Sequence, residues 1–208
     1  QGDGAPGGPM PAYPHLGYST LPSTPDGVVL SGWWKRVLAR IIDNIIIAIV
    51  ALPLTFGPMR QAVSVMQDYI QQVMSAVDAG SSTMPTQPDG LTAPILQISL
   101  TMLVLYLVYE IAFLTLTGAT LGKRVVGISV RLRDEPGPPP LVAVLTRTAV
   151  KQGGDIAGLV PVLGLFGSLF SLLDVLWPLW DPKKQAIHDK AAATNVVVGP
   201  QPKRMPKP

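Results

Sequence analysis

Two long apolar runs dominate the pattern of hydrophobic and polar positions along the chain. The first lies at about residues 33–56 and the second at about residues 94–117. Each is long enough to cross a bilayer as a helix, which takes about 20 predominantly apolar residues. We expect Pro53, Gly57 and Pro58 to end the first helix. The pattern therefore predicts an all-α membrane protein.

Between the two runs, apolar residues recur at three- and four-residue steps: Val63, Met66, Ile70, Val73 and Val77. This spacing predicts an amphipathic helix over about residues 61–79, with a face that rests on the bilayer surface or on a partner. The whole connection is net acidic, which suits the outer side of the membrane.

The last apolar region contains glycines and prolines in its middle, which divide it into helices at about 140–160 and 165–180. The first of these carries Arg147, Lys151 and Asp155, so we expect a tilted or re-entrant helix whose polar face protein must shield from lipid. The result is a bundle of three or four transmembrane or re-entrant helices. Four helices with both termini inside is the preferred architecture, and three spans with the C-terminus outside is the alternative.

Two short runs have the composition of β-strands, at about residues 125–132 and 194–198. An unpaired strand edge is unfavourable, so we expect these two to pair like a β-hairpin on the cytoplasmic side. Residues 32–198 then form the membrane domain. Residues 1–31 are expected to be a disordered Pro/Gly-rich cytoplasmic tail, and residues 199–208 a basic disordered tail. Since the sequence begins with Gln1, we expect the natural start to lie upstream.

Composition agrees with an integral membrane protein. Hydrophobic residues make up 48% of the 208 residues and charged residues only 14%, and the mean hydropathy is +0.36. The net charge is +3, but the basic residues lie beside apolar runs. This arrangement favours membrane orientation over nucleic-acid binding, and it predicts that both termini are cytoplasmic.

The residue types present exclude several kinds of chemistry. The chain has no cysteine and two histidines, so thiol catalysis and thiolate metal sites are excluded. Carboxylates are not clustered, and no Ser/His/Asp constellation is visible. We therefore expect neither a metal, nor a cofactor, nor enzymatic activity.

Charged residues inside the apolar runs are the candidate functional residues. Arg36, Arg40 and Asp43 are spaced to lie on one face of the first helix. A carboxylate in a membrane span costs about 2.5 to 3.5 kcal/mol at the centre, so this face should meet protein or a wet cavity. Glu110 is the one charge in the second span. It is either a carboxyl near the interface, hydrogen-bonded or protonated, or the partner of Arg36 or Arg40.

A basic motif, Gly122-Lys123-Arg124, follows the second span. Together with Gly118 it superficially suggests a phosphate loop. However, one residue too few separates Gly118 from Gly122, and no Ser or Thr follows the lysine. We interpret it as part of a basic inner loop. His188, next to Asp189, is expected to be neutral and to hydrogen-bond the strand pair or the turn at Asp181.

Three segments in this order resemble the RDD family of bacterial membrane proteins. They are Arg36 to Asp43, Thr117 to Val130, and Asp174 to Val197. The family's arginine then falls on Arg36, its first aspartate on Asp43, and its second on Asp174 or Asp189. The resemblance implies a small helical bundle for which transport, including sodium/proton exchange, has been suggested, and which can accompany larger envelope-transport systems.

Two functions follow as alternatives. In the first, the protein is an accessory or assembly subunit of a larger membrane complex, and Arg36 with Asp43 is a charge pair that holds the bundle together. In the second, it is a small oligomeric transporter, in which Asp43, Asp174 and Glu110 form a polar path. Its partners are the lipid bilayer and either other membrane-protein subunits or further copies of itself.

Overall fold

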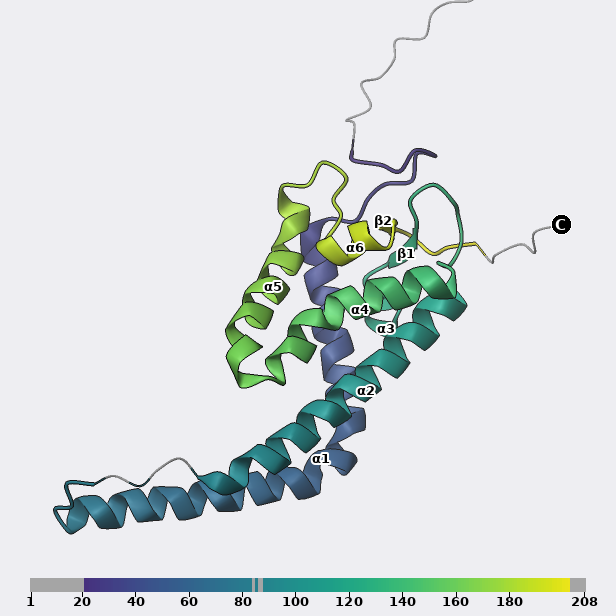
Figure 1. The fold of residues 1–208 in the computed structure, drawn as a ribbon. Coiled ribbons are helices and arrows are strands. Elements are labelled where there is room, and N and C mark those ends of the chain that lie inside the picture. Colours follow the sequence, from purple (N-terminus) through teal and green to yellow (C-terminus); the bar gives the residue numbers. More distant parts are fainter. Residues whose placement is uncertain (1–20, 84, 86–87, 203–208) are drawn as a thin grey trace, which may run out of the picture.

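The structure is a computed structural model that describes residues 21–83, 85 and 88–202. It is mostly helical, with one small sheet (Figure 1). The elements in chain order are α1 (Trp33–Asp78), η1 (Asp89–Leu91), α2 (Thr92–Thr117), α3 (Leu121–Val125), β1 (Ile128–Leu132), α4 (Leu141–Gly158), η2 (Pro161–Leu163), α5 (Gly164–Leu176), η3 (Trp177–Leu179), α6 (Ile187–Ala191) and β2 (Thr194–Val198).

The expected break between the first span and the amphipathic helix is wrong. Both belong to α1, a single helix of 46 residues that contains Pro53 and Pro58. A proline removes one helical hydrogen bond and bends a helix, and membrane helices accommodate it because the freed carbonyls find other donors. Between the two prolines, the Thr55 hydroxyl donates to the carbonyl of Ala51 at 3.0 Å, a contact that also favours bending of the helix. Figure 1 shows the consequence, since the two halves of α1 run in different directions.

Both α1 and α2 are long and apolar enough to cross a membrane. They pack against each other, and many of their large apolar side chains point outward. Ile45, Ile49, Val104 and Val108, for example, are each 55 to 66% exposed. Water would not favour this surface, so it suits contact with lipid.

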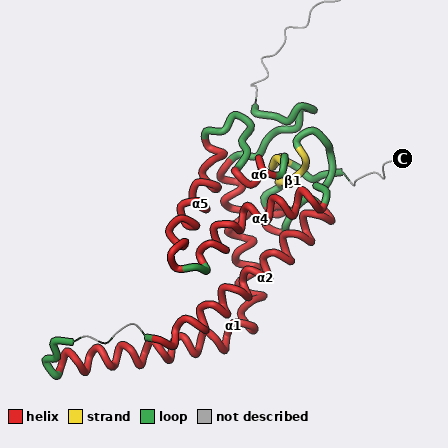
Figure 2. The backbone as a smooth tube through the Cα atoms, in the orientation of Figure 1, coloured by secondary structure: helices red, strands yellow, loops and turns green. Residues whose placement is uncertain are grey.

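Helices α4 and α5 form a hairpin that leaves the sheet end of the molecule and returns to it (Figure 2). The expected boundaries, 140–160 and 165–180, agree closely with Leu141–Gly158 and with α5 plus η3. The two helices touch through glycines. A Cβ added to Gly154 would lie 2.5 Å from the carbonyl oxygen of Gly167, so only glycine permits this approach.

The expected strand pairing is confirmed. β1 and β2 are antiparallel, with Ile128 opposite Val198 and Leu132 opposite Thr194. The first strand begins at Ile128 rather than at residue 125, because residues 121–125 form α3 and Gly127 turns the chain with a φ of +72°. The sheet rests on a small core shared with α1, α2 and α4, formed by Ala39, Leu114, Ile128, Val130, Val144 and Val196. We call α3, α6 and the sheet the cap.

The expectation of disorder in residues 1–31 is wrong for residues 21–31, and residues 1–20 lie outside the described part. Thr24, Asp26 and Gly27 form a tight turn in which the Thr24 hydroxyl donates to Asp26 at 2.6 Å. The chain then lies along β2, with Leu30 bridged to Val197. The segments that enter α1 and leave α6 therefore lie at the same end of the molecule.

The expected C-terminal tail also begins with ordered residues. The Gln201 side chain donates to the Ser129 hydroxyl at 3.0 Å and accepts from the backbone N–H of Gly137 at 3.2 Å. Residues 203–208 lie outside the described part.

Candidate functional site

A chamber of about 200 Å³ lies where α1, α2, α4 and α5 meet the cap. Most of the charged residues singled out in the sequence lie in its wall. The ionisable side chains that line it are Arg36, Arg40, Asp43, Lys123, Arg147, Lys151, Asp174 and His188.

Asp43 is enclosed by hydrogen-bond donors. Its Oδ1 accepts from the Tyr109 hydroxyl at 2.7 Å and from the backbone N–H of Gly122 at 2.8 Å. Its Oδ2 accepts from the Thr120 hydroxyl at 2.6 Å, and Lys123 Nζ lies 3.7 Å away. Arg36 does not pair with Asp43, so the expected charge pair within α1 is wrong. The carboxylate of Asp43 instead fastens α1 to α2 and to the start of α3.

Gly122 is needed for this contact. A Cβ at that position would lie 2.3 Å from the carbonyl oxygen of Ala39 and 2.7 Å from Asp43 Oδ1. The adjacent Lys123 is buried, and burial lowers the pKa of its ammonium to about 8, with the Lys151 cation acting in the same direction. Arg124, by contrast, is exposed and stacks on Phe113 at 5.7 Å, so it lies outside the chamber.

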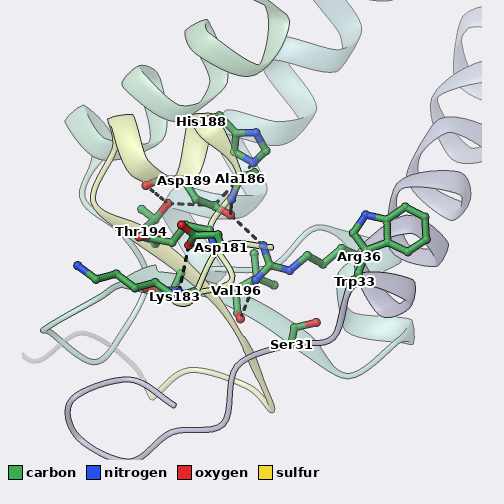
Figure 3. A network of polar contacts seen from close by, with 12 residues as sticks. Ser31, Trp33, Arg36, Asp181, Lys183, Ala186, His188, Asp189, Thr194 and Val196 are labelled. Atoms are coloured by element: carbon green, nitrogen blue, oxygen red, sulfur yellow. Dashed lines mark hydrogen bonds and ion pairs between the residues drawn. The ribbon is translucent and has the colours of Figure 1, made fainter. Parts of the chain in front are cut away.

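Asp189 is the partner that Arg36 does have (Figure 3). Arg36 Nη1 donates to Asp189 Oδ2 at 2.9 Å, and Arg147 Nη1 donates to Oδ1. The backbone N–H of Ala186 and the Thr194 hydroxyl complete the shell of donors. Asp189 is fully buried, so this one carboxylate joins α1, α4, α6 and β2.

Asp174 holds α6 from the end of α5. It accepts from the backbone N–H of His188 at 3.0 Å, and its Oδ2 lies 2.5 Å from His188 Nδ1. Burial, together with the Arg147 cation, lowers the pKa of His188 to about 3. The imidazole is therefore neutral, as expected, and donates from Nδ1 to Asp174 rather than to the sheet or to Asp181. Both candidates for the family's second aspartate, Asp174 and Asp189, are thus buried beside the chamber.

Glu110 pairs with Lys151, whose Nζ donates to Oε1 at 2.8 Å and also to the Tyr106 hydroxyl. Of the two alternatives for Glu110, a pairing with Arg36 or Arg40 is therefore wrong, and the carboxyl is hydrogen-bonded. Arg40 lines the chamber, yet among the described residues it has neither a hydrogen bond nor a carboxylate within 4.0 Å.

Sequence reasoning did not assign Arg147 and Lys151 to the site, although a signal was present. The two are four residues apart in a helix that is otherwise apolar on its outer side, so they share one face. Tyr109 and Thr120 gave no comparable signal, because a neutral hydroxyl is common in membrane helices and turns.

The chemistry available to this arrangement is electrostatic. Within the described residues, no group of three or more His, Asp or Glu side chains is placed to hold a metal ion. The Asp43, Asp174 and Asp189 carboxylates are occupied by protein donors, whereas several cationic side chains have donors to spare. Arg36 Nε and Arg147 Nε are buried without an acceptor among these residues.

One comparison with known proteins gives a match. The model of the RDD family matches residues 30–193, a range that includes α1, α3, β1, α6 and most of the chamber wall. No curated protein and no solved structure matches the chain.

Proposed function

The chain belongs to the RDD family, and from this premise we propose that it is an inner-membrane accessory or assembly subunit of a larger membrane complex. In this proposal α1 and α2 span the bilayer, and the cap with its many lysines and arginines lies in the cytoplasm. α5 has 13 residues, or about 20 Å of helix, so the α4–α5 hairpin enters the bilayer without crossing it.

The observation that carries the proposal is an unpartnered apolar stripe on the second half of α1. We call it the distal stripe, and its members are Val63, Met66, Ile70, Met74 and Val77, each 40 to 62% exposed. The neighbouring side chains Val65, Tyr69 and Val73 are half-buried on a different face of the helix. The helix therefore has one apolar face in contact with the rest of the chain and a second that is free among the described residues.

The charge of this segment favours a protein partner over a lipid surface. Helices that lie on anionic membranes have polar faces rich in lysine and arginine. Residues 61–78 contain neither, and their polar face carries Asp68 and Asp78 among glutamines and serines. Anionic headgroups would repel such a face, while a neighbouring membrane protein can cover the stripe.

The interior charges support the same conclusion. Asp43 and Asp189 each accept from several protein donors, so neither is free to bind and release a cation without breaking contacts between helices. A small oligomeric transporter remains the second candidate, because Arg40, Asp43 and Asp174 do line a chamber.

The proposal is tested by gentle purification of the full chain from its native membrane. We expect another membrane protein to co-purify in a fixed ratio, and the double variant M66Q/I70Q to lose it. The matched control is Q67A/Q71A, which alters two exposed residues on the polar face of the same helix and should keep the partner.

Reconstitution separates the two candidates. If the purified chain alone, in proteoliposomes, moves cations and D43N abolishes the flux, the transporter is right and the accessory role is wrong. If the M66Q/I70Q variant still co-purifies with the partner, the distal stripe is not the contact surface.

A further inference from the structure

The wall of the chamber is richer in cations than in carboxylates. Arg36, Arg40, Lys123, Arg147 and Lys151 line it. Four carboxylates lie in or beside it, those of Asp43, Glu110, Asp174 and Asp189, and His188 is neutral. Five positive charges therefore lie in the wall of this space against four negative ones in or beside it.

Two cationic side chains that line the chamber also hold buried donors without an acceptor among the described residues, although Glu110 Oε2, beside it, is a buried acceptor without a donor there. Arg147 is 2% exposed, and its Nε has no acceptor among the described residues. Arg36 Nε is also buried without an acceptor there. Lys123 donates only to Thr120, at 3.1 Å, and Arg40 makes no hydrogen bond within the described residues. A buried donor without an acceptor costs about 1 to 3 kcal/mol. A group that brings several acceptor oxygens would satisfy these donors together.

One side of the chamber is apolar. Trp33, Val37 and Ile41 from α1 face Val175 and Pro178, which lie at the end of α5 and in η3. Ile41 is also 50% exposed, so the chamber reaches the molecular surface beside it. The Trp33 indole donates to the carbonyl of Val175 at 2.8 Å and ties the two walls together next to the cap.

We propose that the chamber binds the phosphate group of an anionic amphiphile, with the phosphate held by Arg36, Arg40 and Arg147 and the apolar part directed past Ile41. Guanidinium groups match the oxygens of a phosphate in geometry and charge. The apolar wall and its exposed edge give the remainder of the ligand a path toward lipid. This site is separate from the distal stripe and does not depend on a protein partner.

The test is calorimetric titration of the full chain in a neutral detergent with three ligands: sodium phosphate, short-chain phosphatidic acid and short-chain phosphatidylcholine. We expect phosphatidic acid to bind about tenfold more tightly than either of the others. Equal binding of phosphatidylcholine would overturn the role of the arginines. If inorganic phosphate binds as tightly as phosphatidic acid, the ligand is a free anion and the proposed amphiphile is wrong.

The variant R40Q tests the assigned contact without disturbing an ion pair, since Arg40 has none among the described residues. We expect it to weaken phosphatidic acid binding about tenfold or more, as for one lost charge-assisted hydrogen bond, at an unchanged thermal midpoint of the free protein. R40K should retain part of the affinity. The control R124Q removes an exposed cation outside the chamber. If R124Q weakens binding as much as R40Q, binding is non-specific and the proposal fails.

Discussion

At the scale of single residues, Asp189 has the most connected position among the buried charges. It receives hydrogen bonds from two arginines, a hydroxyl and a backbone N–H that belong to four parts of the chain. The Asp189 carboxylate therefore stabilises the arrangement of the helices, whatever further role it has.

Replacing Asp189 by Asn should remove about 3 to 5 kcal/mol of unfolding free energy, because Arg36 and Arg147 would stay buried without their counter-charge. Chemical unfolding in detergent, followed by tryptophan fluorescence, measures this loss. Asp155 is exposed on α4, so D155N is the control and should change the stability little. A loss below about 1 kcal/mol for D189N would show that the pairing contributes little.

His188 should make stability depend on pH in the acidic range. Its pKa is about 3 in the fold against a usual 6.5, so between these values the unfolded chain binds a proton that the folded chain does not. The unfolding free energy should therefore fall as the pH decreases below about 6.5, by up to about 1.4 kcal/mol per pH unit.

The groups that face His188 are Asp174 from α5, Asp189 from α6 itself, and Arg147 and Lys151 from α4. The measurement is the unfolding free energy of wild type and H188N from pH 7 to pH 5, and the difference between the two slopes isolates His188. Identical slopes would mean that the pKa of the imidazole is the same in the fold as in the unfolded chain.

At the scale of elements, periodicity and apolar length located the long helices and both strands, but not the short helices α3 and α6. The boundaries that failed share a physical cause. Prolines and glycines were expected to end α1 at residues 53–58, but proline in a membrane helix bends the helix and need not end it. Similarly, the first strand was expected to begin at residue 125, yet α3 extends to that residue. Asp43 supplies an acceptor for Gly122 N–H at the start of α3, and this favours the helical turn.

The thermal midpoint of the protein should depend on which glycine of α4 is replaced, Gly154 or Gly158. In G154A the new methyl group would lie 2.1 Å from Ser171 Oγ and 2.5 Å from the carbonyl oxygen of Gly167, so the helices must separate and the thermal midpoint should fall. In G158A the methyl group meets nothing within 4 Å, and helix propensity should stabilise the protein by up to about 1 kcal/mol. Equal midpoints for the two variants would contradict this packing.

At the scale of the whole molecule, the sequence predicted which charges are buried but not which of them meet. Helical spacing placed Arg36 and Asp43 on one face of α1, and both do point inward. The partner of Arg36, however, is Asp189, 153 positions later, and the cation nearest to Asp43 is Lys123, 80 positions later. No local pattern encodes such pairings. Only the tertiary packing of the cap against α1 brings these groups together.

The proposed topology places the cap and the tip between α1 and α2 on opposite sides of the membrane. The chain has no cysteine, so single cysteines can be introduced without background labelling. Ser82, near the tip, is exposed, and so is Lys183, in the loop that leads into α6 of the cap. In intact cells, an impermeant maleimide should label S82C, and it should label K183C only after permeabilisation. Labelling of both cysteines in intact cells would contradict the topology.

The bridge between Leu30 and Val197, together with the ion pair between Arg36 and Asp189, has a consequence for biosynthesis. The ribosome makes α1 first, whereas Asp189 and β2 follow α1 to α5. Until then, Arg36 has no counter-charge and the segment before α1 has no strand to pair with. Contacts between such distant residues form slowly, so the cap should close only after the helices have entered the membrane. A nascent chain stalled before residue 189 would therefore be a substrate for insertion chaperones and quality-control proteases.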